Sequence, residues 1–143
     1  MSASVSPNAV AVASELSTAL KGKLEQPKLD ALIEGLKAPA ATYTAIGTTI
    51  NVIFYIHVAC GITSGRGFNG NAGGFAAPPG GTGGGQVYTN DIDRLYRDTV
   101  AFSFVAAVAY LGIQFFDKDH NLLGHYEGGG LYTPATGGGS GSF

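Results

Sequence analysis

Residues 50–60 read Ile50-Asn-Val-Ile-Phe-Tyr-Ile-His-Val-Ala-Cys60, and this stretch decides the fold class. Its β-branched and aromatic side chains recur at every second position, a period that favours an extended strand over a helix. One predicted face holds Ile50, Val52, Phe54, Ile56 and Val58. The other predicted face holds Asn51, Ile53, Tyr55, His57 and Ala59. Because the period of two begins at Thr42, we predict a strand region that starts there.

Further strand candidates follow toward the C-terminus, separated by turn-forming residues. They are 86–89, 100–105, 108–116, 121–127, 131–133 and 140–143. The sequence Asp-Lys-Asp-His-Asn at 117–121 is typical of a hairpin loop. A brief helix is expected over 90–97, with acidic residues in its first turn and arginines in its last. Several short strands at this spacing indicate a compact antiparallel barrel or sandwich.

The first 40 residues have a different pattern, and we expect them to be helical or partly disordered. Residues 7–25 begin with Pro7 and carry apolar side chains at helical spacing. A shorter helix is expected over 29–36, ended by Gly35 and Pro39. These helices either dock on the following domain or fray as a leader. The predicted organisation is therefore an N-terminal segment, 1–40, followed by a β domain, 41–143.

Composition excludes several classes of protein. The 143 residues carry a formal net charge of −2 and are only 13% charged, whereas a nucleic-acid-binding surface is rich in Lys and Arg. Cys60 is the single cysteine, so no disulfide can form within one chain. Residues 40–62 and 99–116 are uncharged but alternate, so we expect no transmembrane span. The N-terminus lacks the basic and apolar regions of a signal peptide.

The motifs in the sequence do not assemble a catalytic or metal site. Residues 65–70 match G-x-G-x-x-G, but the residues after them cannot form the helix that would hold a dinucleotide. Asp117, Asp119 and Asn121 have the opening spacing of a calcium loop, but Leu122 stands where that loop needs glycine. No serine lies in the sharp turn that exposes a nucleophile. We therefore predict no enzyme activity, no cofactor and no metal site.

Phe68 and Phe75 are candidates for contact with a membrane or a partner. They lie in residues 65–85, a stretch rich in glycine, asparagine and proline that we expect to form a long connection. The alternative is that the two phenylalanines tuck back onto the β domain, since large exposed apolar patches are uncommon.

His57, His120 and His125 are candidates for sensing pH. Protonation of all three would move the formal charge of the chain from −2 to +1, which favours approach to anionic lipid in an acidic compartment. A cleft shared by His125, His57 and a carboxylate would instead indicate an enzyme.

Four segments of the chain resemble a known family, in the same order along the sequence. They are Tyr88–Phe104, Phe115–Gly130, Gly137–Phe143 and Phe68–Gly74. They are similar to segments of the virulence-associated (Vap) proteins of pathogenic actinobacteria. The resemblance implies that 41–143 form an eight-stranded antiparallel β-barrel in Greek-key order, with one short helix. It also implies secretion, no known catalysis and effects on host endolysosomal membranes. The glycine-heavy residues 76–85 and Cys60 depart from the family pattern.

Two functions follow as hypotheses. The first is a non-enzymatic secreted virulence-associated effector that acts at host phagosomal or endolysosomal membranes, with anionic lipid as its partner. The alternative is a β-barrel interaction module that binds a host protein or a carbohydrate. In that case exposed tyrosines would supply stacking surfaces, namely Tyr88, Tyr96, Tyr126 and Tyr132. Binding to lipid vesicles favours the first hypothesis, and saturable binding of a protein or glycan favours the second.

Overall fold

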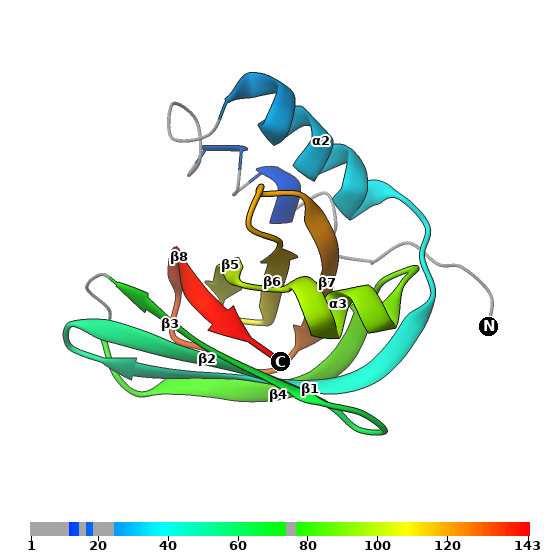
Figure 1. Cartoon of the computed structure of the whole chain (residues 1–143). Coiled ribbons are helices and arrows are strands. Elements are labelled where there is room, and N and C mark those ends of the chain that lie inside the picture. Colours follow the sequence, from blue (N-terminus) through cyan, green and yellow to red (C-terminus); the bar gives the residue numbers. More distant parts are fainter. Residues whose placement is uncertain (1–11, 15–16, 19–24, 74–76) are drawn as a thin grey trace.

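The computed structural model describes residues 12–14, 17–18, 25–73 and 77–143, and its strands close into a barrel (Figure 1). The helices with defined bounds are α2 (Gln26–Lys37) and α3 (Ile92–Asp98). The strands are β1 (Thr42–Val52), β2 (Tyr55–Ile62), β3 (Gly67–Gly73), β4 (Gly80–Tyr88), β5 (Ala101–Ala107), β6 (Tyr110–Phe116), β7 (Leu122–Gly129) and β8 (Ala135–Ser142). They follow the order β1-β2-β3-β8-β5-β6-β7-β4 around the barrel, and every neighbouring pair is antiparallel. The predicted eight-stranded antiparallel barrel with a short helix is confirmed.

The strand region that begins at Thr42 is a hairpin of two strands. Val52 of β1 pairs with Tyr55 of β2 across a two-residue turn formed by Ile53 and Phe54. Residues paired across such a turn lie on the same face of the sheet, so the alternation of faces shifts by one position after it.

Because of this shift, the side chains that face the inside of the barrel are polar just before the turn and apolar after it. Before it, Thr49 and Asn51 are buried in the barrel and Ile50 is half exposed, whereas Ile56 and Val58 are buried after it. The predicted faces, which ran unbroken through 50–58, are therefore wrong for the first strand. The inward Asn51 is accommodated because its side-chain amide donates a hydrogen bond to the carbonyl oxygen of Ala77 at 2.8 Å.

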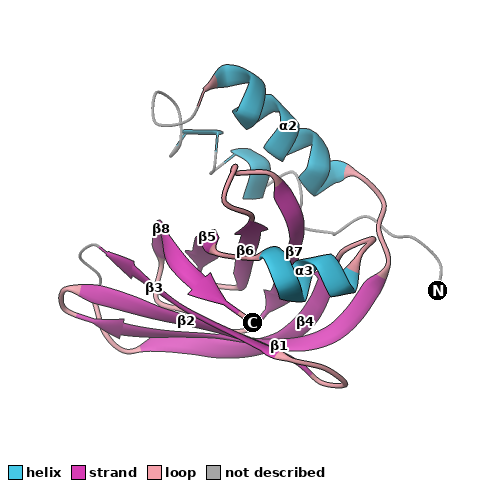
Figure 2. Cartoon of the chain, viewed as in Figure 1, coloured by secondary structure: helices cyan, strands magenta, loops and turns pink. Residues whose placement is uncertain are grey.

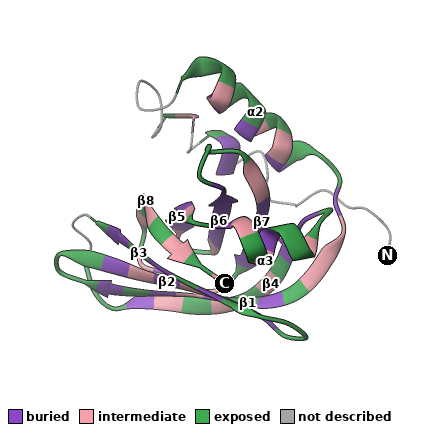
Figure 3. Cartoon of the chain, in the orientation of Figure 1, coloured by how far each residue is buried: buried purple, intermediate pink, exposed green. Residues whose placement is uncertain are grey.

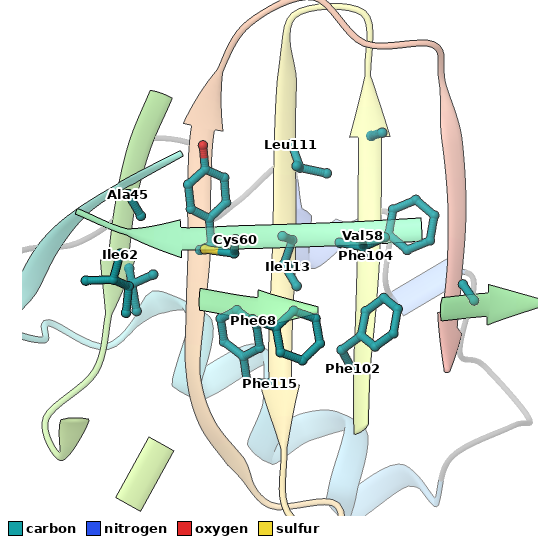
Figure 4. Close-up of a cluster of buried hydrophobic side chains, with 14 of the residues drawn as sticks. Ala45, Val58, Cys60, Ile62, Phe68, Phe102, Phe104, Leu111, Ile113 and Phe115 are labelled. Atoms are coloured by element: carbon teal, nitrogen blue, oxygen red, sulfur yellow. The ribbon is translucent and has the colours of Figure 1, made fainter. Parts of the chain in front are cut away.

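Aromatic and branched side chains fill the barrel, and Phe68 of β3 lies among them (Figure 4). The Phe68 ring meets the rings of Phe102 and Phe115 edge to face, with centroids 5.3 and 4.9 Å away. Such pairs stabilise a core beyond the burial of their area. Cys60 belongs to the same core, and burial raises the pKa of its thiol, so we interpret it as an inert packing residue.

Strands β3 and β4 occupy the stretch 65–85 that the sequence indicates as a long connection. That prediction is wrong because glycine occurs both in loops and in strands whose backbones approach closely. A Cβ atom at Gly83 of β4 would overlap the carbonyl oxygen of Gly129 in β7, so the two strands approach too closely for a side chain at this position. The glycines of β4 permit this close pairing, but they lack the branched side chains that identify a strand.

The N-terminal part of the structure lies against the outer wall of the barrel (Figure 1). The apolar face of α2, formed by Leu29, Leu32 and Leu36, packs in one cluster with Val105 of β5 and Phe116 of β6. This cluster has no residue in common with the core inside the barrel. The structure therefore has two apolar cores, one on each side of the β5–β6 wall.

The two predicted N-terminal helices differ in how much of each is described. The helix α2 contains the predicted helix 29–36 and continues through Gly35 to Lys37. Of the predicted helix 7–25, residues 12–14 and 17–18 are helical, and most of the rest lies outside the described residues. Val12 and Ala13 are buried in the same cluster as α2.

Candidate functional site

Antiparallel strands place their connections alternately at the two ends of the barrel (Figure 2). One end, here the charged end, carries the turn 63–66, helix α3 and the loop 117–121. The other, here the uncharged end, carries the turns 53–54 and 108–109, the connection 74–79, which is described from residue 77, and the loop 130–134.

Ionisable side chains are distributed unequally between these ends. The connections of the uncharged end contain no Asp, Glu, Lys or Arg in their sequence. The charged end holds Arg66, Asp91, Asp93, Arg94, Arg97, Asp98, Asp117, Lys118 and Asp119. Within the eight strands, Glu127 is the one such residue. The barrel is therefore polarised from one end to the other.

Large apolar side chains are exposed at the uncharged end. The tip of the β1–β2 hairpin at this end has the colour of exposed residues (Figure 3). Phe54 is 76% exposed and its neighbour Ile53 is 52% exposed at the tip of the β1–β2 hairpin. Val108 and Leu131, from two other connections, are 61% and 77% exposed. At the charged end, Val100 is the one large apolar residue in the described part of the chain with comparable exposure. Exposed apolar side chains gathered at one end of a barrel are candidates for an interaction surface.

The predicted contact residue Phe68 does not belong to the exposed apolar side chains at this end of the barrel. Phe68 is 1% exposed inside the barrel, so its predicted contact with a membrane is wrong and it packs back onto the domain. The reason is that successive side chains of a strand point to opposite faces of the sheet, so Phe68 points inward and Asn69 outward. Phe75 lies outside the described residues.

The three histidines lie in different parts of the molecule. His57 is on the outer wall of β2, with its ring nitrogens 3.0 Å from Asn71 Oδ1 and 3.2 Å from Asn69 Oδ1. His120 is exposed in the loop 117–121 with a φ of 63°. His125 is buried on the outer side of β7. No cleft shared by His57, His125 and a carboxylate exists among the described residues, and pH sensing by the three histidines stays a prediction.

His125 belongs to a buried polar strip on the outer wall of the barrel, formed by Ser103, Gln114, His125 and Glu127. Ser103 Oγ donates to Gln114 Oε1 at 2.7 Å, and His125 Nδ1 lies 3.1 Å from Glu127 Oε2. Gln114 Nε2, His125 Nδ1 and both carboxylate oxygens of Glu127 nevertheless lack a hydrogen bond of acceptable geometry. One imidazole and one carboxylate are fewer than the three or four protein ligands of a zinc site. The described residues contain no group of three His, Cys, Asp or Glu that could hold a metal ion.

A cavity of about 260 Å³ opens beside His125, between the end of α2 and helix α3. Asp91 and Arg94 line it, but both are engaged elsewhere. Asp91 Oδ1 accepts a hydrogen bond from the Arg94 backbone N–H at 3.0 Å and caps α3, and the Arg94 guanidinium lies 3.4 Å from Asp117 Oδ2. We therefore assign no catalytic role to this cavity.

The Asp117 carboxylate organises the loop 117–121. It accepts hydrogen bonds from the backbone N–H groups of Asp119 and Asn121, both at 2.9 Å, and from Asn121 Nδ2 at 3.1 Å. Burial opposes its ionisation, but these hydrogen bonds and Arg94 outweigh that effect, so the pKa of Asp117 is below its ordinary value. The sequence pattern that partly matches a calcium loop is therefore explained by a turn whose carboxylate binds its own backbone.

Replacing Asp117 with asparagine is expected to lower the free energy of unfolding by about 1–2 kcal/mol at neutral pH. A lowered pKa in the folded state stabilises the protein above the unfolded-state pKa, and this stabilisation is lost as the pH falls through the folded-state value. The difference between wild type and Asp117→Asn should therefore shrink below about pH 4. Urea unfolding of both proteins across this range measures it, and a constant difference would contradict the assignment.

Most of the tyrosines that sequence analysis marks as stacking surfaces are buried. Tyr88, Tyr126 and Tyr132 are 4% exposed or less, and Tyr96 is partly buried against Phe143. The predicted exposed surface for carbohydrate stacking is therefore wrong. Tyr126 and Tyr132 point inward because they occupy the interior positions left by neighbouring glycines.

Four exposed apolar residues were not identified as contact candidates from the sequence, namely Ile53, Phe54, Val108 and Leu131. The available signal was the absence of charge over 38–65 and 99–116, and over 128–143 for Leu131. That signal becomes specific only when the topology brings these connections to one end of the barrel.

Comparisons with known proteins agree with this architecture. A family model described as Rhodococcus equi virulence-associated protein matches residues 3–143. The structure of virulence-associated protein VapB from the intracellular pathogen Rhodococcus equi is 36% identical, with a TM-score of 0.65, over 71% of this chain and 94% of that chain. Virulence-associated protein VapD from the same organism is 31% identical, with a TM-score of 0.66, over 71% and 96%. No curated protein matches the chain.

The match extends over nearly the whole sequence, and the two relatives are named for virulence rather than for an enzymatic activity. Within the described residues, no helix is long and apolar enough to cross a bilayer. The chain belongs to the Rhodococcus equi virulence-associated protein family.

Proposed function

We propose that this protein is a non-enzymatic, secreted effector that acts at host phagosomal or endolysosomal membranes and docks on them through the uncharged end of the barrel. The observation that carries this proposal is the coincidence, at one end, of exposed apolar side chains and a complete lack of charged residues in the connections. Membership of a virulence-associated family supports an action on a host.

The distribution of charge favours lipid over a polar partner. Moving one Phe, Ile, Leu or Val side chain out of water contributes about 1.5–3 kcal/mol when it is fully buried. Phe54, Ile53, Val108 and Leu131 lie on three connections at the same end of the barrel, so insertion of this end into a bilayer would bury them together. No ionisable side chain in these connections has to be desolvated, and the charged end stays in water.

This docking mode has a consequence for lipid selectivity. Because the uncharged end has no Lys or Arg, we expect binding at about pH 7 to be similar for neutral and anionic vesicles. His57 and His120 are the histidines that reach the surface, so any gain on anionic lipid at about pH 5 would come from them.

Vesicle co-sedimentation with dye leakage, at both pH values and with both lipid compositions, tests the proposal. We expect binding to neutral vesicles at either pH, with the fold intact by circular dichroism. If the folded protein binds neither type of vesicle at either pH, the membrane proposal is wrong. Saturable binding to a host protein or a glycan would then identify the chain as an interaction module.

A further inference from the structure

We propose that residues 12–14 and α2 form a releasable cover, and that the wall of β5, β6 and β7 beneath them is a second lipid-binding surface. This inference rests on the proposed membrane function. It concerns a different face of the molecule from the uncharged end.

The cover buries apolar groups on the outside of the barrel. Leu32 and Leu36 of α2 lie in one cluster with Val105 and Phe116 of the wall, and Leu122 packs against the same cluster. Release of the cover would therefore expose two matching apolar faces, one on the helix and one on the wall.

The contact between cover and wall also traps polar atoms. Val12 lies over Gly112, where a Cβ atom would be 3.0 Å from Val12 Cγ2 and 3.3 Å from Gln114 Nε2. Glu127 pairs with Gly112 across β6 and β7. Gln114 Nε2 and Glu127 Oε1 are buried in this region without a hydrogen bond, and the contact of Glu127 Oε2 with His125 Nδ1 at 3.1 Å lacks hydrogen-bond geometry. Buried polar groups in folded proteins are nearly always paired. The covered state thus leaves unmade hydrogen bonds that water would form in the uncovered state.

The barrel does not depend on the cover for its own core. The apolar cluster beneath the cover and the core inside the barrel have no residue in common. The cover is thus an element that the wall can release without loss of the barrel.

A lipid surface fits both released faces. The charged residues of α2 are two of each sign: Asp30, Glu34 and Lys37 are exposed, and Lys28 is partly buried. The Lys28 ammonium donates to the Asp119 carbonyl oxygen at 3.0 Å and to Asn121 Oδ1 at 3.2 Å, bonds that release of the cover would exchange for water. Such a helix can lie at a bilayer interface through its apolar stripe without needing anionic lipid. On the wall, Glu127 and Gln114 would face the interfacial water that the cover excludes.

A disulfide between α2 and β7 is the sharpest test. An ideal Cβ atom at Gly35 lies 3.9 Å from Leu122 Cβ, within the 3.5–4.5 Å range of disulfides. In the double variant Gly35→Cys/Leu122→Cys, oxidation locks the cover and reduction frees it, so the reduced protein is a matched control. Cys60 does not compete, because it is fully buried. We expect the oxidised form to bind vesicles about tenfold more weakly than the reduced form. Equal binding of the two forms would overturn the proposal.

Hydrogen exchange tests the release of the cover without any lipid. We expect the α2 amides to exchange through local opening, at least about a hundredfold faster than the amides of β5 and β6. Glu127→Met removes unpaired buried oxygens under the cover and should slow exchange in α2 about tenfold. Thr49→Val removes an unpaired buried hydroxyl inside the barrel and should leave the local opening of α2 unchanged. If α2 exchanges only as slowly as β5 and β6, the cover is not releasable.

The two experiments separate this inference from the membrane proposal. If wild type fails to bind vesicles while α2 exchanges by local opening, the membrane proposal and the lipid role of the wall both fail, and the releasable cover stands. If wild type binds vesicles and the locked form binds equally well, the uncharged end accounts for binding and the second surface is wrong.

Discussion

An aspartate in place of Phe54 is expected to weaken binding to neutral vesicles between about tenfold and a hundredfold. The substitution removes the most exposed side chain of the hairpin tip, which is worth about 1.5–3 kcal/mol when fully transferred out of water. It also places a charge at the uncharged end of the barrel, whose connections have none. Because Phe54 lies in a turn, and no ladder hydrogen bond depends on its side chain, the barrel should stay folded.

Val100→Asp provides the matched control for this experiment. Val100 is 47% exposed, but it lies at the charged end, between α3 and β5. The same change of an exposed apolar residue into aspartate should leave vesicle binding within about twofold of wild type. Equal losses for Phe54→Asp and Val100→Asp would show that net charge, rather than the position of the apolar surface, governs binding. Co-sedimentation titrations of the three proteins, all checked for native circular dichroism, decide between these outcomes.

The parts of the fold that sequence analysis predicted are those with a strong local signal. Asp91 and the arginines after it mark α3, and the loop at Asp117 marks the β6–β7 hairpin. The two-residue turn at Ile53 and Phe54 was missed because neither residue is a usual turn former.

The candidate site was harder to predict than the fold because it depends on topology. Phe54, Val108 and Leu131 are far apart in the sequence, and each alone is an ordinary exposed apolar residue. They come to the same end of the barrel only because antiparallel strands return their connections there. For Phe68, the sequence left both exposure and packing onto the domain open, because a phenylalanine in a glycine-rich stretch is placed only when that stretch is known to be a strand.

The glycines also determine where the interior side chains lie, and Tyr126 of β7 shows the consequence. It is fully buried, and a Cβ atom at Gly47 of β1 would lie 2.7 Å from Tyr126 Cζ. The Tyr126 hydroxyl accepts a hydrogen bond from the Gly47 backbone N–H at 3.1 Å and donates one to the Gly83 carbonyl oxygen at 3.3 Å. Burial raises the pKa of Tyr126, so its hydroxyl keeps the proton that it donates.

Tyr126→Ala is accordingly expected to lower the free energy of unfolding by about 3–5 kcal/mol, the range for removing a large aromatic side chain from a core. Tyr126→Phe keeps the ring and loses only the hydroxyl bonds, so about 1–2 kcal/mol is expected. Denaturant unfolding at neutral pH measures both. Similar losses for the two variants would mean that the hydrogen bonds, rather than the packing of the ring, hold β7 against β1 and β4.

Gly47→Ala tests the contact between β1 and the Tyr126 ring independently. In wild type the added methyl group meets the Tyr126 ring, and overpacking of this kind costs about 1–3 kcal/mol. In the Tyr126→Ala background the ring is absent, so the same methyl group should cost little or partly fill the cavity. The double-mutant cycle should then give a coupling of about 1–3 kcal/mol. Additive effects would show that Gly47 is needed for its backbone conformation alone, and that the ring does not determine the choice of glycine in β1.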